Sequence, residues 1–178
     1  MIKQEFKIKE IEILKSLIGK KIININYTYP VYGNIKIDFD SCSIVISNLM
    51  HEGSLAGDDD DITYFTLEKI SKEDKFEFFL NDVKTDSIKV NETIKSIEII
   101  NDLINYNDEY EISYDVAIVF ITDKHKYIIS RDWFYMETMQ INVDKDIDDI
   151  LDKNTIIEQY RGESTEVKVE IERTSREI

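Results

Sequence analysis

The chain has 178 residues, of which 42% are hydrophobic and 33% are charged, a composition typical of one soluble globular domain and not of a disordered chain. Its 22 basic and 37 acidic residues leave a formal net charge of −15, which argues against nucleic acid or an anionic membrane as a partner, because phosphate binding needs clustered Lys and Arg. The same charge favours a positively charged partner, although solubility alone would also explain it.

The first part of the chain changes from helical to strand periodicity. Apolar residues recur at helical spacing from residue 8 to residue 18, and Gly19 follows as a stop, which predicts a helix over residues 7–18. Alternating apolar residues then predict an antiparallel meander of three strands, over residues 21–30, 35–39 and 43–47. Residues 49–61 form the longest predicted loop, which contains the four consecutive aspartates from Asp58 to Asp61.

The middle of the chain is predicted to be mostly strand. Residues 62–70 give a fourth strand, and residues 71–80 give a short helix with Ser71 as its N-cap. Residues 92–104 fit either a helix or a strand, and their many β-branched residues favour the strand. Residues 109–122 show the clearest alternation, which predicts one shared face made of Tyr110, Ile112, Tyr114, Val116, Ile118 and Phe120.

The last part adds short elements. Further strands are predicted over residues 127–130 and 136–143, then an acidic helix over residues 144–154 and a helical or extended segment over residues 156–160. The whole pattern predicts a single α+β domain over residues 1–162, mostly antiparallel β-sheet with an N-terminal helix and a few short helices. Residues 163–178 follow as a C-terminal edge strand or tail.

The sequence gives no sign of an oxidising compartment or a membrane. Cys42 is the only cysteine, so no disulfide can form within the chain. The first 21 residues carry charges throughout, unlike a signal peptide, and no stretch approaches about 18 consecutive apolar residues. We therefore expect a cytoplasmic protein.

Motifs for metal, cofactor or catalytic chemistry are weak. Residues 144–155 place aspartates at the first, third and fifth positions of an EF-hand loop, but the sixth residue is Asp149 and the twelfth is Thr155, where glycine and glutamate are required. There are only two histidines and no glycine-rich phosphate loop. We expect no cofactor, no metal and no enzymatic activity.

One aromatic cluster admits two interpretations. Trp133 lies beside Phe134 and Tyr135, with Arg131 close by in the sequence. Such clusters can stack on bases or anchor an interface, and they can equally pack in a core at the edge of a sheet. The acidity of the chain favours the core.

The acids are concentrated in two segments that contain no Lys or Arg, residues 37–68 and residues 96–123. On an ordinary mixed surface, bases are interspersed with acids, so these segments predict a surface for a basic partner, with a solvated loop as the alternative. The candidate contact residues are Asp58, Asp59, Asp60, Asp61, Asp102, Asp108, Glu109 and Glu111.

The stretches "LIGKKIININY" and "SYDVAIVFITDKHKYIISRDWFYMETMQI" resemble the helix–strand opening and the late β-hairpin of bacterial immunity proteins, the antitoxins of contact-dependent inhibition and other polymorphic toxin systems. The resemblance covers most of the chain as a pattern and has no diagnostic motif. It implies a non-enzymatic protein that neutralises a cognate basic toxin domain, often an RNase or DNase, by covering its active site. The alternatives are an acidic DNA mimic or other interaction module, and a divalent-metal-binding protein.

Overall fold

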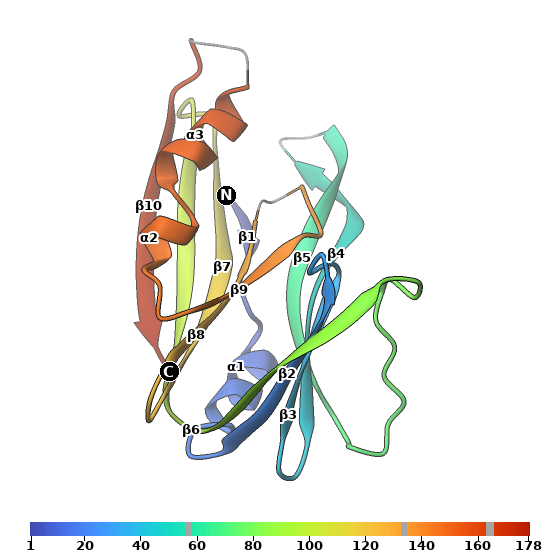
Figure 1. The fold of residues 1–178 in the computed structure, drawn as a ribbon. Helices are drawn as coiled ribbons and strands as arrows, with labels where there is room; N and C mark the ends of the chain where they lie inside the picture. The colour runs from blue at the N-terminus through green and yellow to red at the C-terminus, as the bar shows by residue number, and fades with distance from the viewer. Residues whose placement is uncertain (56–57, 133–134, 163–165) are drawn as a thin grey trace.

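The computed structural model describes residues 1–55, 58–132, 135–162 and 166–178, without the side chains of residues 53–55 and 58–60. It confirms the predicted α+β class, because the chain forms one compact domain of mostly antiparallel strands with short helices (Figure 1). The first elements are β1 (Ile2–Gln4), α1 (Ile8–Lys15), β2 (Lys21–Tyr29), β3 (Asn34–Phe39), β4 (Ser43–Leu55) and β5 (Asp58–Ile70). The later elements are β6 (Lys84–Tyr106), β7 (Tyr110–Thr122), β8 (Lys126–Arg131), β9 (Met139–Val143), α2 (Ile147–Ile150), α3 (Lys153–Arg161) and β10 (Val169–Glu177).

The long strand β6 joins two halves of a strongly bent sheet. Its first half pairs with β2 and continues the order β5-β4-β3-β2-β6, which we call the first half-sheet. Its second half pairs with β7 and continues as β6-β7-β8-β9, which we call the second half-sheet. The C-terminal strand β10 adds to the other edge of β6, and the short β1 adds in parallel to β7.

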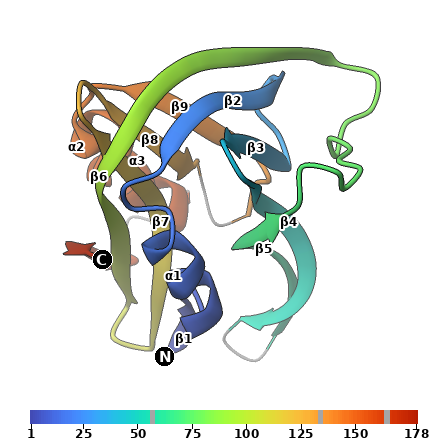
Figure 2. The same ribbon diagram turned by 90° about the horizontal axis from the view of Figure 1, so that it is seen from below.

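The main core lies between the two half-sheets. Apolar side chains from both halves are fully buried in it, such as Ile25 and Ile37 from the first and Ile97 and Phe120 from the second. Leu14 of α1 is also fully buried in this core. Seen from below, α1 lies between the two half-sheets and covers this end of the core (Figure 2).

A second core lies on the other face of the second half-sheet. Leu151 and Ile156, from the segments of α2 and α3, are buried against Ile112 and Val119 of β7. The two short helices therefore cover this face beside β10 (Figure 1). No helix in the described part of the chain is long and apolar enough to span a membrane.

The prediction that one face of residues 109–122 is shared by six alternating residues is wrong. The register of β7 against β6 shifts between Ala117 and Asp115, which leaves Val116 as an extra residue, a β-bulge. A bulge of one residue exchanges the two faces of a strand. Residues before it, such as Tyr114, therefore face the second core, whereas Ile118 faces the main core.

Two further predictions are wrong. Residues 49–55 and 58–61 do not lie in a loop, because β4 and β5 remain paired as far as Leu55 and Asp58; the other two residues of the predicted loop, Ala56 and Gly57, lie outside the described residues. Residues 71–80 do not form a helix, and the Ser71 amide instead donates to Asp74 within a turn, at 2.7 Å. The strand interpretation of residues 92–104 is confirmed by β6.

Candidate functional site

The first acidic feature is the outer end of the β4–β5 hairpin. Its strands stay paired as far as Leu55, opposite Asp58, and Glu52 lies opposite Asp61. Of strand β4, only residues 43–47 pair with β3, so the rest of the β4–β5 hairpin extends beyond β3 (Figure 1). Glu52 and Asp61 are exposed, whereas the side chains of Asp58 and the next two aspartates are outside the described part. The run of aspartates, predicted to lie in a loop, therefore forms the start of strand β5.

The second acidic feature is the β6–β7 turn. Asp108 and Glu109 are exposed there, and Glu111 just after them is half-buried. Asn107 and Asp108 have φ angles of 57° and 56°, a left-handed conformation that Asn and Asp adopt more readily than most residues. The Lys168 ammonium lies 4.0 Å from the Asp108 carboxylate, so one base partly offsets this charge.

Stacking and backbone hydrogen bonds fix the position of this turn. The rings of Tyr106 and Tyr110 stack at a centroid distance of 4.8 Å. The Asn107 amide donates to the Lys168 carbonyl at 2.7 Å, and the Lys168 amide donates to the Asn107 side-chain oxygen at 3.2 Å. The acidic turn is thus attached to the segment that leads into β10.

The two acidic features lie at the same end of the molecule. The end of the β4–β5 hairpin and the β6–β7 turn lie on either side of the N-terminus, in the view of Figure 1 and in the rotated view of Figure 2. The candidates Asp58 to Asp61 are therefore brought to the same end as Asp108, Glu109 and Glu111 by the bending of the sheet.

The prediction that Asp102 contributes to this surface is wrong. Asp102 is fully buried and accepts two hydrogen bonds of 2.7 Å from the Arg173 guanidinium of β10. Arg173 also donates to Asp148 at 2.8 Å and to the Leu151 carbonyl at 2.7 Å. Although burial opposes it, the contact with Asp102 raises the pKa of Arg173. This buried pair joins β6, β10 and α2.

A second carboxylate of the base-free segments is also buried. Asp115 accepts from the Phe6 amide at 2.7 Å, from the Asn101 amide group at 3.0 Å and from Arg176 of β10 at 3.0 Å. Burial raises the pKa of Asp115 despite these donors. Residues 96–123 contain no Lys or Arg in the sequence, but in the folded protein β10 brings two arginines against them.

The aromatic segment around Trp133 is only partly described, since Trp133 and Phe134 lie outside the described residues. Arg131, which precedes them, is 1% exposed, donates to the Thr63 carbonyl at 3.1 Å and lies 4.5 Å above the Tyr114 ring. Burial lowers the pKa of Arg131 to about 10 and raises that of Tyr114 to about 12. Arg131 thus ties β8 to the edge of β5.

The two lone histidines do not lie together in a ligand group. No cluster of three or more His, Cys, Asp or Glu side chains suited to a metal ion occurs among the described residues. His125 Nδ1 donates a 2.6 Å hydrogen bond to the Asp144 carboxylate, and the Glu92 carboxylate lies 3.8 Å from His125 Nε2. The hydrogen bond with Asp144 raises the pKa of His125, which lies at the β7–β8 turn.

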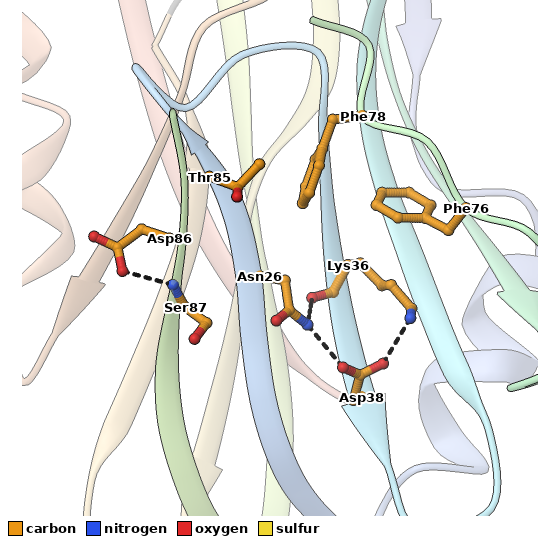
Figure 3. A pocket seen from close by; sticks show the side chains of 8 residues that line it. All are labelled: Asn26, Lys36, Asp38, Phe76, Phe78, Thr85, Asp86 and Ser87. Carbon is orange, nitrogen blue, oxygen red and sulfur yellow. Dashed lines mark hydrogen bonds and ion pairs between the residues drawn. The ribbon is translucent and has the colours of Figure 1, made fainter. Parts of the chain in front are cut away.

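Sequence reasoning missed a hollow of about 400 Å³ on the outer face of the first half-sheet (Figure 3). Its floor is formed by Asn26, Lys36 and Asp38 of β2 and β3. Residues 85–87 of β6 form one wall, and Phe76 with its neighbour Phe78 in the β5–β6 connection forms the other. The only sequence signal was the alternation of "KFEFF", which the helix prediction obscured.

The comparisons with known proteins give no relative: no family model, no curated protein and no solved structure matches this chain.

Proposed function

We propose that this protein is a non-enzymatic immunity protein that binds a basic toxin domain acting on nucleic acid and covers its active site. The observation that carries the proposal is the convergence of two acidic hairpin ends, far apart in the sequence, at one end of the molecule (Figures 1 and 2). The chain itself performs no reaction in this proposal.

The physical reason is charge complementarity. Carboxylates gathered at one end produce a directed negative potential, which speeds the encounter with a basic protein and fixes its orientation. A protein that binds nucleic acid presents clustered Lys and Arg around its active site. Exposed carboxylates on two extended hairpins, such as Asp61 and Glu109, can therefore occupy the place of phosphates.

The test uses the product of the reading frame next to this gene. We expect that product to be toxic when expressed alone and harmless when expressed with this protein. Purified, the two should bind tightly by calorimetry, more weakly as salt concentration rises, because exposed charges are screened. A harmless neighbour that does not bind would contradict the proposal.

Charge-reversal variants locate the surface. One variant carries Asp108→Lys and Glu109→Lys, and a second has Asp58 to Asp61 all changed to Lys. We expect each variant to bind that product roughly tenfold more weakly or worse at low salt, mainly because association is slower. The matched control reverses Glu12 of α1 and Asp40 of the β3–β4 turn, both exposed at the opposite end. The Asp108/Glu109 variant and this control reverse two charges each, so equal losses in these two variants would show that only net charge matters.

A further inference from the structure

The hollow on the first half-sheet opens on the outer face of the sheet, and the strand register decides which side chains enter it. Asn26 pairs with Ser87 of β6 and with Lys36 of β3, so these three side chains stand on one face. Asp86 pairs with Tyr27, so its carboxylate lies on the opposite face and does not enter the hollow. One base and one acid then remain among the charged side chains that line the hollow.

These two charges neutralise each other. The Lys36 ammonium lies 3.1 Å from the Asp38 carboxylate. Although partial burial opposes them, hydrogen bonds from Ser43, Lys36 and Asn26 keep the pKa of this carboxylate below its ordinary value, so the pair stays ionised. Among the described residues that line the hollow, no charge is left over, although the whole chain carries −15. A charged ligand would lose its hydration without gaining a counter-charge, so the hollow suits a neutral ligand.

The polar groups of the hollow include both donors and acceptors. The amide hydrogens of Asn26 are committed to the Asp38 carboxylate at 2.8 Å and to the Lys36 carbonyl at 3.3 Å, which leaves its side-chain oxygen as an acceptor. The hydroxyl groups of Thr85 and Ser87 line the facing wall, and each can rotate to donate or to accept. Such a set matches a ligand whose own polar groups are hydroxyls, because these also donate and accept.

The remaining wall is aromatic. The half-buried rings of Phe76 and Phe78 meet edge to face at a centroid distance of 4.9 Å. The Lys36 ammonium lies 5.7 Å from the centre of the Phe76 ring, so this ring already has a cation as its partner. The Phe78 ring projects into the hollow between Phe76 and Thr85 (Figure 3). It offers a flat apolar face directly beside the polar groups, which suits a ligand with one apolar face and a polar rim.

We propose that this hollow binds a neutral sugar ring, the pyranose unit of a saccharide. A pyranose presents C–H groups on a ring face and hydroxyls around its edge. Its C–H face would lie against Phe78, and its hydroxyls would bond to the Asn26 side-chain oxygen and to Ser87. The volume of about 400 Å³ lies within the range of small-molecule sites. This inference does not rest on the proposed function.

The test is a titration of the isotopically labelled full chain, followed by amide NMR shifts, with the methyl pyranosides of glucose, mannose and galactose. We expect at least one of them to give saturable shifts at Asn26, Phe78 and Ser87, with a dissociation constant on the order of millimolar. The weakest of the three should bind at least about threefold less tightly than the best, because an epimer misplaces one hydroxyl. Glycerol, which has hydroxyls without a ring, should give no saturable shifts.

Variants of the aromatic wall identify the stacking face. Phe78→Ala should weaken binding of the best sugar about fivefold or more, whereas Phe78→Tyr retains the ring face and should bind within about twofold of the native chain. The control is Tyr29→Ala, which removes a 71% exposed aromatic side chain of β2 outside the hollow and should leave binding unchanged. Ser87→Ala should weaken binding about threefold without touching the β5–β6 connection, which separates loss of a contact from displacement of that connection.

The proposal is overturned by any of four results: no localised saturable shifts with the three sugars, equal shifts with glycerol, unchanged binding in Phe78→Ala, or unchanged binding in Ser87→Ala. Adenosine provides a planar aromatic ligand for comparison, and localised shifts with adenosine but with none of the sugars would assign the hollow to a base instead. The neighbouring gene product takes no part in these measurements, so the sugar site and the immunity proposal stand or fall separately.

Discussion

At the scale of single residues, the same side-chain type has opposite roles in this protein. Asp61 and Asp108 are exposed, whereas Asp102 and Asp115 are fully buried and bound by arginines of β10. Burial of a carboxylate is tolerated only when hydrogen bonds and an opposite charge replace its water. The sequence neighbours of these aspartates do not reveal which environment each one has.

We expect Asp102→Ala to lower the free energy of unfolding by about 3–5 kcal/mol, because it leaves the nearly buried Arg173 without its main partner. Urea denaturation measures this change. Glu172→Ala, at an exposed position on the same strand, is the control and should change stability by less than about 0.5 kcal/mol. A cost for Asp102→Ala as small as that of the control would mean that water replaces the ion pair.

The His125–Asp144 pair should make stability depend on pH. The hydrogen bond with Asp144 raises the pKa of His125 above its ordinary value of 6.5. The contribution of the charged histidine is therefore fully present below about pH 6.5 and is lost as pH rises through the folded pKa. We expect His125→Gln to lower the melting temperature at pH 6 and not at high pH. The measurement is a series of thermal melts across this range.

A substitution of Asp144 distinguishes its hydrogen bond with His125 from other interactions of the β7–β8 turn. Asp144→Asn retains an oxygen to accept from the Lys126 amide, which donates to Asp144 at 2.8 Å. It should remove the same pH dependence, and the double variant should lose no more than either single variant. A pH dependence that survives in both single variants would assign it to other groups.

At the scale of elements, side-chain contacts with distant segments override local signals. The β5–β6 connection has the acids and apolar residues of a short helix, yet it forms an extended wall over the first half-sheet. Its Phe79 stacks on Tyr32 at 5.9 Å, and Asn34 accepts from the Phe79 amide at 3.0 Å. These contacts with the β2–β3 turn stabilise the extended conformation in place of the helix.

Two glycines test how closely the β5–β6 connection packs against the β2–β3 turn. Gly33 has a φ of +72°, and a Cβ added to it would lie 2.6 Å from the Phe79 Cβ, whereas Gly19 has a φ of +82° with nothing within 4 Å. We expect Gly19→Ala to cost about 1–2 kcal/mol from backbone strain alone, and Gly33→Ala about 2–5 kcal/mol from strain plus crowding. Chemical denaturation of both variants measures the difference. An equal loss of stability in both variants would mean that the β5–β6 connection moves away from the added methyl group without a loss of free energy.

At the scale of the whole molecule, the bend of the sheet decides where charge gathers. Strand β6 pairs with β2 along its first half and with β7 along its second, so each acidic hairpin belongs to a different half-sheet. The bend brings the outer ends of both hairpins to one end of the molecule (Figures 1 and 2). The proposed partner surface is therefore a product of the fold and cannot be read from either acidic segment.

Much of the fold could be predicted from the sequence because its signals are local. Helical spacing before Gly19 gave α1, and alternation gave β2, β3, β7 and the antiparallel class. The charge of −15, which concerns composition alone, was likewise determined by the sequence. The start of β5 at Asp58 was missed because four aspartates disfavour a strand locally, and only pairing with β4 makes them one.

Only the tertiary structure decided which carboxylates are exposed and which side chains meet. The bulge at Val116 exchanges the faces of β7, and β10 returns from the end of the chain to place Arg173 on Asp102. The hollow on the first half-sheet likewise combines Asn26, Phe78 and Ser87 from three segments. These features depend on contacts between residues distant in sequence, whereas periodicity reports only on each segment by itself.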